Sequence, residues 1–402
     1  MKVRTLKVLG VAALTATFLT SCNQESEVQN PEIELVAPST SQVIPGQYIV
    51  VFNQDFSRSM ENGKLSYQKA QENTKSQTMK LMADAGIKGE VFNVYSKTIN
   101  GAAIKLSEEG ADALRKRKEV AYVEEDRIVA LAPGGKGKPG GGGGSTSQST
   151  PYGITRVGGG ATYTGSNAAW VVDTGIDLNH EDLNVDASRG FNAFTSGKDG
   201  RSLDDGNGHG SHVAGTIAAI DNNLGVIGVA AGATVIPVKV LDSRGSGSYS
   251  GVVAGVDYVG ANAANGDVAN LSLGGPVSQA LDDAVLAASE KGVKFVLAAG
   301  NDGDDANNHS PARVNGNNIY TISAMDSNDR LASFSNYGNP PVDFAAPGVA
   351  IQSTWKDGGY NTISGTSMAA PHAAGILLWG NFNSGGTVNG DPDGNPDTII
   401  VR

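Results

Sequence analysis

The sequence predicts an α/β fold with a doubly wound, mostly parallel sheet, preceded by a small ferredoxin-like α+β domain. Three observations carry this prediction. From residue 151 onward, short apolar runs alternate with helix-like segments. Residues 48–123 instead show the order βαββαβ. Between the two regions, a glycine-rich run at 134–144 has too few apolar side chains to bury a core, so it indicates a domain boundary.

The first domain is predicted from four strand-like runs and two helix-like segments. Ser107 precedes Glu108 and Glu109, which is typical of a capped helix N-terminus with acidic side chains in its first turn. The expected strands are 48–52, 91–95, 102–106 and 120–123, and the expected helices are 65–85 and 107–118.

The second domain is predicted from near-continuous apolar strands that are joined by helical crossovers. Strands of this kind belong to parallel sheets that are covered on both faces, and chemistry gathers where loops leave their carboxyl ends. The expected strands are 168–172, 235–241, 268–273, 294–299 and 319–324, and the expected helices are 209–220, 250–263, 278–291 and 369–379.

The N-terminus has the pattern of an export signal. Basic residues precede an apolar run from Val8 to Leu19, which is too short to span a bilayer. The run ends in LTSC at Cys22, the only cysteine, and this resembles a bacterial lipoprotein signal in which the cysteine is acylated. An ordinary secretory signal with an incidental cysteine is the alternative, and both imply export.

The chain is therefore expected to divide into five parts. These are a signal (1–22), a polar tether (23–42), the first domain (43–132), a glycine-rich linker (133–146) and the second domain (147–402). Asp and Glu outnumber Lys and Arg by 41 to 30, for a formal net charge of −11. Since no basic cluster is large, we expect no nucleic-acid partner. A monomer is expected.

Four polar residues stand at the predicted ends of strands or starts of helices. Asp173 follows the strand at 168–172, Asn301 follows the strand at 294–299, and His209 and Ser367 stand where helices begin. A serine becomes a nucleophile when a histidine takes its proton and a buried carboxylate orients that histidine. An amide donor then stabilises the oxyanion that forms. The four residues supply these roles in the order Asp, His, Asn, Ser.

This order, together with five motifs, resembles the subtilase family of subtilisin- and proteinase K-like serine endopeptidases. The resemblance covers residues 148–380 and is carried by DTGID at Asp173, GHGSHVAGT around His209, LSLGG at Leu271, AAGN at Ala298 and GTSMAAPH at Gly365. It implies that Asp173 orients His209, that His209 is the general acid and base, that Ser367 is the nucleophile and that Asn301 is the oxyanion donor. The substrates it implies are polypeptides.

Two other interpretations remain open at this point. The chain could be a catalytically silent subtilase-like binding protein, although all four predicted catalytic residues are present. It could also be a lipase or esterase with the same triad, although the expected edges for an extended peptide favour a peptidase.

The resemblance also implies substrate subsites. A peptide would add as a strand between one edge, formed by Gly245, Ser246 and Gly247, and another, formed by Ser272, Leu273 and Gly274. Tyr249 would cover an apolar subsite walled by Val252 and Leu281, unless it is only a surface aromatic. The primary specificity pocket would be lined by Ala298, Ala299 and Gly300, with His309 near its base.

Oxygen-rich loops resemble the calcium sites of the family. The stronger set of implied ligands comprises Gln148, Asp182, Ile220, Asn222, Leu224 and Val226. The weaker set comprises Asn317, Ile319 and Asp343. The segment 391–397 also spaces oxygens like a calcium loop, but we favour an acidic solvated tail there.

The first domain looks like the subtilase propeptide, an intramolecular inhibitor and folding aid that makes the chain a zymogen. Its end is separated from the expected mature N-terminus by the linker, so cleavage is expected between Leu131 and Ser147. The acylated Cys22 would be the only link to the membrane. The expected location is the cell envelope or surface, with release of the peptidase domain after processing.

Overall fold

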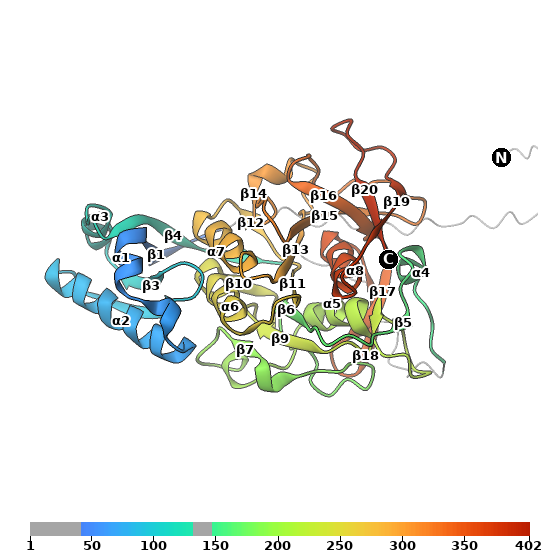
Figure 1. The fold of residues 1–402 in the computed structure, drawn as a ribbon, viewed down its shortest axis with the longest axis horizontal. Coiled ribbons are helices and arrows are strands. Elements are labelled where there is room, and N and C mark those ends of the chain that lie inside the picture. The colour runs from blue at the N-terminus through green and yellow to red at the C-terminus, as the bar shows by residue number, and fades with distance from the viewer. Residues whose placement is uncertain (1–41, 132–146) are drawn as a thin grey trace, which may run out of the picture. The chain divides into compact units, whose positions relative to one another are not determined.

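The computed structural model describes residues 42–131 and 147–402 (Figure 1). The predicted signal (1–22), the tether as far as residue 41 and the glycine-rich linker (133–146) lie outside the described residues. Within the described ranges, no helix is both long and apolar enough to cross a membrane.

The first domain has the predicted ferredoxin-like topology. Strands β4, β1, β3 and β2 are adjacent in that order, and each neighbouring pair is antiparallel. The Ser107 side chain accepts a hydrogen bond from Gly110 N, as its predicted capping role requires. The elements are β1 Val43–Phe52, α1 Gln54–Ser59, α2 Tyr67–Asp84, β2 Gly89–Tyr95, β3 Gly101–Leu106, α3 Glu108–Arg115 and β4 Val120–Ala130.

Successive side chains along β1 point to opposite faces of this small sheet. Tyr48, Val50 and Phe52 pack against α2 and α3 in the domain's own core. Ile49 and Val51 face the other way and join a core that contains residues of α6 and α7 in the second domain. The first domain therefore packs on the second domain through this second face of its sheet.

The second domain is built on a nine-stranded sheet that is mostly parallel, and the alternation of strands and helices predicted the parallel arrangement. Its order is β19-β20-β16-β15-β13-β11-β6-β9-β7, and only the β19–β20 pair is antiparallel. These strands are β6 Ala169–Asp173, β7 Phe191–Asn192, β9 Val235–Lys239, β11 Val268–Leu271, β13 Lys294–Ala298, β15 Ile319–Met325, β16 Val342–Pro347, β19 Asn383–Thr387 and β20 Thr398–Val401.

Helices cover both faces of this sheet (Figure 1). Helices α5 (His209–Ala218) and α8 (Thr366–Leu378) share one core with Val171 of β6. Helices α6 (Tyr249–Asn262) and α7 (Gln279–Ser289) share the opposite core with Trp170. Each fully buried aliphatic side chain in these cores contributes about 1.5–3 kcal/mol relative to exposure.

The chain reverses its direction of winding at β6. It continues from β6 to β9 on one side and then returns to place β11 on the other side. In a doubly wound sheet, such a switch point opens a crevice at the carboxyl ends of the strands. The shorter elements are α4 Tyr152–Arg156, β5 Ala161–Thr162, β8 Ala230–Ala231, β10 Ser246–Ser248, β12 Gly275–Pro276, β14 His309–Ser310, β17 Ile351–Trp355 and β18 Gly359–Ile363.

One feature near the C-terminus differs from the sequence-based expectation. Helix α8 begins at Thr366 rather than at Ala369, so Ser367 lies inside its first turn. The tail covers the sheet edge by adding two strands, since β20 pairs with β16 and β19 pairs with β20. Pro371 lies inside α8 and cannot donate to Ser367 O, but Ser272 Oγ donates to that carbonyl at 2.8 Å and replaces the missing bond.

Candidate active site

Asp173 and His209 form a buried pair at the carboxyl end of β6. Asp173 is fully buried, and both of its carboxylate oxygens lie 2.9 Å from His209 Nδ1. Burial lowers the pKa of His209, but the charge and hydrogen bond of Asp173, with a smaller effect of the Asp205 charge, outweigh burial and raise the pKa overall. The carboxylate therefore fixes the ring orientation and favours the imidazolium.

His209 is the first residue of α5, and the residue before it must be a glycine. Gly208 has a φ of +116°, and a Cβ on it would lie 2.2 Å from Trp355. Both the backbone conformation and the close approach of the indole exclude a side chain at residue 208. This contact places the start of the helix, and with it the imidazole, beside Asp173.

Asp205 lies beneath this arrangement and was not predicted from the sequence. It is 4% exposed, and its carboxylate accepts five hydrogen bonds. The donors are Thr174 Oγ1 (2.9 Å), Asn207 N (2.9 Å), Gly208 N (2.8 Å), Ser211 N (2.9 Å) and Ser211 Oγ (2.7 Å). One carboxylate thus ties the residue after Asp173 to the loop and helix that carry His209. The only sequence signal is an acid just before a glycine-rich helix start.

Ser367 opens onto the same crevice from α8. It is 9% exposed, and its hydroxyl donates to Ser272 O at 3.0 Å. Ser272 and Ser367 therefore exchange two hydrogen bonds, one in each direction. Within the described residues, no hydrogen bond joins the Ser367 hydroxyl to His209, so the two predicted partners are not bonded to each other in this conformation.

Asn301 directs its amide group toward Ser367. Its Oδ1 accepts from Thr366 N at 2.8 Å and from Thr366 Oγ1 at 3.0 Å, which fixes the side chain. A Cβ placed on Gly365 would lie 3.6 Å from Asn301 Nδ2 and 3.7 Å from Ser367 N. Two N–H donors therefore border the same small space beside the serine, which suits a developing oxyanion. The anchoring role of Thr366 was not predicted.

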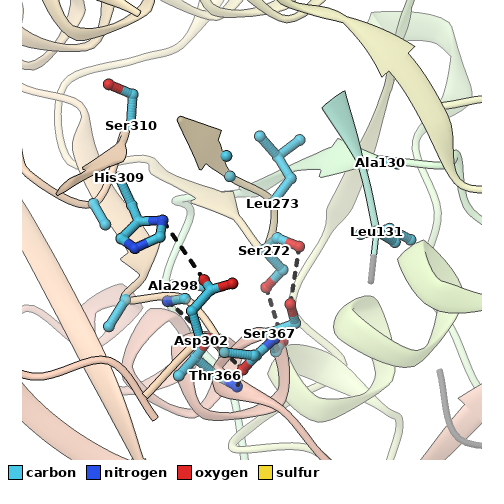
Figure 2. Close-up of a pocket in the computed structure, with 16 residues that line it drawn as sticks. Ala130, Leu131, Ser272, Leu273, Ala298, Asp302, His309, Ser310, Thr366 and Ser367 are labelled. Atoms are coloured by element: carbon cyan, nitrogen blue, oxygen red, sulfur yellow. Dashed lines mark hydrogen bonds and ion pairs between the residues drawn. The ribbon is translucent and has the colours of Figure 1, made fainter. Parts of the chain in front are cut away.

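A pocket next to Ser367 gathers most of the residues expected at the specificity site (Figure 2). The strand ends β11 and β13 supply its two walls, and β14 supplies its far side. Asp302 also lines it, and this residue was not predicted from the sequence. The predicted residues that line it are Ser272, Leu273, Gly274, Ala298, Ala299, Gly300 and His309.

The predicted peptide-binding edge is paired with the last strand of the first domain. Strand β10 runs antiparallel to β4, with Ser246 opposite Ala130 and Gly247 opposite Val129. Leu131 N then donates to Gly245 O at 2.8 Å. Ala130 and Leu131 also line the pocket beside Ser367. The first domain therefore occupies the edge that an extended peptide would use.

Tyr249 lies under this strand rather than on the surface. It is fully buried, its hydroxyl donates to Pro276 O at 2.6 Å, and it shares a core with Val129. Val252 and Leu281, the expected walls of an apolar subsite, belong to the same core.

Two carboxylates of the first domain contact the second domain at the starts of α6 and α7. Glu124 accepts from Ser278 Oγ (2.5 Å) and Ala280 N (3.2 Å) at the start of α7. Asp126 accepts from Ser250 N (3.0 Å) and Ser250 Oγ (2.5 Å) at the start of α6. An anion at a helix N-terminus satisfies N–H groups that have no partner within the helix. The first domain thus completes the capping of both helices.

The stronger predicted calcium set is brought together around Asp182. Its carboxylate accepts from Val226 N (3.1 Å) and Asn222 Nδ2 (3.1 Å), and burial raises its pKa to about 6. Gln148 Nε2 donates to the carbonyls of Ile220 (2.6 Å) and Val226 (3.1 Å). Leu224 N donates to Asn222 Oδ1 at 2.8 Å.

Carboxylate, amide and carbonyl oxygens of this kind are the ligands that calcium takes in proteins. The side-chain nitrogen of Gln148 faces the carbonyl oxygens of Ile220 and Val226. If the side-chain amide is rotated by half a turn, its oxygen faces the same space as those two carbonyl oxygens. In the weaker set, the carboxylate of Asp343 accepts a hydrogen bond from Thr321 N at 2.8 Å. Among the described residues, no cluster of three or more His, Cys, Asp or Glu side chains could hold a metal ion, so carbonyl and amide oxygens would be essential.

Comparison with known proteins agrees with this geometry. A profile described as "Subtilase family" matches residues 170–380, and one described as "Peptidase inhibitor I9" matches residues 47–132. The chain is 39% identical to the extracellular serine proteinase of Thermus sp. (strain Rt41A) over 365 residues, which is 87% of this chain and 83% of that protein. It is 41% identical to subtilisin E of Bacillus subtilis (strain 168) over 314 residues, or 74% and 76% of the two chains.

A solved structure is also similar. The crystal structure of a cold adapted subtilisin-like serine proteinase superimposes with a TM-score of 0.52 at 39% identity, covering 62% of this chain and 96% of that one. Fold, motif order and these matches agree, and the chain belongs to the subtilase family of serine proteases, with a peptidase inhibitor I9 domain before the protease domain.

Proposed function

We propose that this subtilase is a secreted endopeptidase in which Ser367 attacks the peptide carbonyl, His209 carries the proton and Asp173 orients His209. The observation that carries this assignment is the contact of His209 Nδ1 with both oxygens of the buried Asp173 carboxylate. This contact leaves the opposite ring nitrogen, Nε2, as the proton acceptor.

The Ser367 hydroxyl must change its hydrogen bond for the reaction to begin. The hydroxyl leaves Ser272 O and donates to His209 Nε2, which removes the proton as Oγ bonds to the carbonyl carbon. The oxyanion then accepts from Asn301 Nδ2 and Ser367 N. His209 gives the proton to the leaving amine, and a water molecule later hydrolyses the acyl-enzyme by the same steps.

The first domain is proposed to keep the enzyme inactive until it is removed. Strand β4 uses the hydrogen-bonding edge of β10, and Leu131 lines the pocket beside Ser367, so no substrate can bind there at the same time. The carboxylates of Glu124 and Asp126 add contacts to α7 and α6. This arrangement supports a self-inhibited zymogen that is cut after the inhibitory strand.

Calcium is proposed to stabilise the protease domain. Asp182, Asn222, the amide oxygen of Gln148 and the carbonyls of Ile220 and Val226 would hold it, with the Leu224 carbonyl as a further ligand. A bound cation would compensate the charge of Asp182, which is fully buried. Its role would be structural.

Export through a lipid-anchored precursor is proposed from the sequence of the N-terminus. Cys22 would carry the acyl group, and it precedes the inhibitor domain along the chain. A cut after the inhibitory strand would therefore separate the protease domain from the anchor.

The nucleophile is tested with a serine-directed fluorophosphonate. The full chain, once processed, is expected to be labelled, and Ser367→Ala is expected to lose the label because the attacking oxygen is gone. Ser384→Ala, which removes an exposed hydroxyl from the tail, should keep it. Label retained in Ser367→Ala, or absent from processed wild type, would favour a catalytically silent binding protein.

The effect of Asp173 on His209 is tested by NMR titration of histidine side chains in the Ser367→Ala chain. Adding Asp173→Asn removes the charge that raises the pKa of His209 and leaves burial, which lowers it, so the titration should move to lower pH. His209→Gln assigns the signal, and Asp357→Asn, an exposed change, should not move it. An unchanged pKa would contradict the proposed pairing.

Calcium binding is tested by thermal unfolding of the Ser367→Ala chain, which cannot digest itself. Calcium at about 100 times its Kd should add about 2.7 kcal/mol of stability, and a chelator should remove it. Asp182→Ala should abolish the response to calcium, whereas Asp343→Ala should preserve most of it. Equal melting temperatures with calcium and with chelator would rule out a stabilising site.

Anchoring is tested by metabolic labelling with a clickable fatty acid and by immunoblotting of membrane and medium. The inhibitor fragment should carry the label and remain with the membrane, while the processed protease domain should be in the medium. The Ser367→Ala chain should stay on the membrane intact, and Cys22→Ser should lose the label. A processed protease domain found only in the membrane fraction would contradict the proposal.

A further inference from the structure

Lys239 is a buried cation that the proposed mechanism does not use. Its side chain is 1% exposed, and it is the one lysine or arginine that is buried among the described residues. It is the last residue of β9 and stands opposite Asp173 of β6. Burying a charge costs free energy unless the charge is paired and hydrogen-bonded. A charge at this place, beside the strand that carries the catalytic carboxylate, is therefore expected to do more than fill space.

The ammonium group of Lys239 contacts oxygens of three different segments. Its Nζ donates to Thr174 O at 2.5 Å and to Leu241 O at 3.2 Å, and it lies 3.4 Å from Asp199 Oδ1. Thr174 directly follows β6, and Leu241 directly precedes the turn at 242–245. Asp199 lies in the loop between β7 and α5, and it is the only carboxylate that forms an ion pair with the lysine within the described ranges. The lysine therefore joins the catalytic strand to two neighbouring loops.

Asp199 extends this contact into the turn at 242–245. Its carboxylate accepts from Ser243 N at 2.9 Å and from Ser243 Oγ at 3.3 Å. The side chain of Asp199 is 20% exposed, and water and salt screen such a partly buried ion pair less than an exposed one. Lys239 therefore holds the turn at two points, because it binds Leu241 O just before the turn and also the carboxylate that binds Ser243 inside it.

The same turn carries the edge that the inhibitor strand occupies. Gly245 O, at the end of the turn, accepts from Leu131 N at 2.8 Å, and β10, which begins at Ser246, pairs with β4. An extended peptide would use these same backbone groups once the inhibitor domain is removed. The position of this edge therefore depends on how the turn is held against β6.

We propose that Lys239, paired with Asp199, is a positioning residue for extended peptide substrates and acts by fixing the turn at 242–245. The inference rests on the proposed function, because it concerns the peptide that Ser367 attacks. Without the ammonium group, Leu241 O loses a donor and Asp199 loses its counter-ion, so the turn is held less firmly and the peptide forms weaker hydrogen bonds along the edge. In the described part of the chain, the lysine makes no hydrogen bond to the catalytic carboxylate or imidazole, so these groups are expected to keep their positions.

The test compares a substrate that reaches the edge with one that does not. A succinyl-Ala-Ala-Pro-Xaa p-nitroanilide extends along the edge, whereas an N-acetyl-Xaa ethyl ester has a single residue before the bond that is cut. Xaa is the same in both and is the residue that wild type cleaves fastest. The full chain is expressed and allowed to process itself, and active sites are counted with the fluorophosphonate so that misfolded protein does not enter the rates. The readout is kcat/KM for the tetrapeptide divided by kcat/KM for the ester.

Lys239→Met and Asp199→Asn are each expected to lower this ratio about fivefold, which corresponds to roughly one hydrogen bond between peptide and edge. The ester rate should change little. The double variant should lower the ratio no further than either single variant, because the two residues act through one ion pair. Lys294→Met is the matched control, since it removes a lysine that donates to Leu377 O at 2.7 Å from the amino end of β13. It should keep the wild-type ratio.

Three results would overturn this inference while the proposed function stands. One is an ester rate that falls as much as the tetrapeptide rate, because the lysine would then act on the catalytic groups. Another is an unchanged ratio in Asp199→Asn, and this variant decides the question if Lys239→Met does not fold. The third is a double variant in which the two single effects multiply, because the residues would then act separately. If wild type shows no Ser367-dependent hydrolysis of any substrate, the proposed function itself fails.

Discussion

The site depends on one buried interaction, in which the carboxylate of Asp173 holds the imidazole of His209 at the switch point of the sheet. Burying a charged carboxylate costs free energy unless it is paired and hydrogen-bonded. Asp173 is fully buried, and His209 and Thr174 N supply its partners. The pair in turn requires α5 to begin beside β6. The glycine before His209 and the hydrogen bonds of Asp205 meet that requirement.

The inhibitor domain contacts the protease domain through hydrogen bonds to carboxylates, the kind of interaction that also organises the catalytic site. Its last strand, β4, pairs with the edge of β10. Two of its carboxylates accept hydrogen bonds from backbone N–H groups at the starts of α6 and α7. Asp257 makes the reciprocal contact from the protease side by accepting from the backbone N–H groups of Ser96, Lys97 and Thr98. Inhibition and interdomain stability therefore come from one continuous surface, and a substrate competes with only part of it.

Much of the architecture could be predicted because it depends on local patterns. The βαββαβ order, the alternation of strands and helices and the cap at Ser107 are confirmed, since periodicity and capping are properties of short segments. Helix α8 begins at Thr366, three residues before the expected start, and Ser272 supplies the hydrogen bond to Ser367 O that Pro371 cannot donate. Asp205 and Thr366 were missed, because their partners are brought close only by the fold.

The sequence by itself determined the residue types and the order of the catalytic motifs, because each motif is a short run of neighbouring residues. Tertiary structure decided the rest. It alone placed Asp302 against His309, paired β4 with β10 and directed the Ser367 hydroxyl to Ser272 rather than to His209. The physical reason is that hydrogen-bond partners and local charge depend on distances between segments, and no periodicity along one segment encodes those distances.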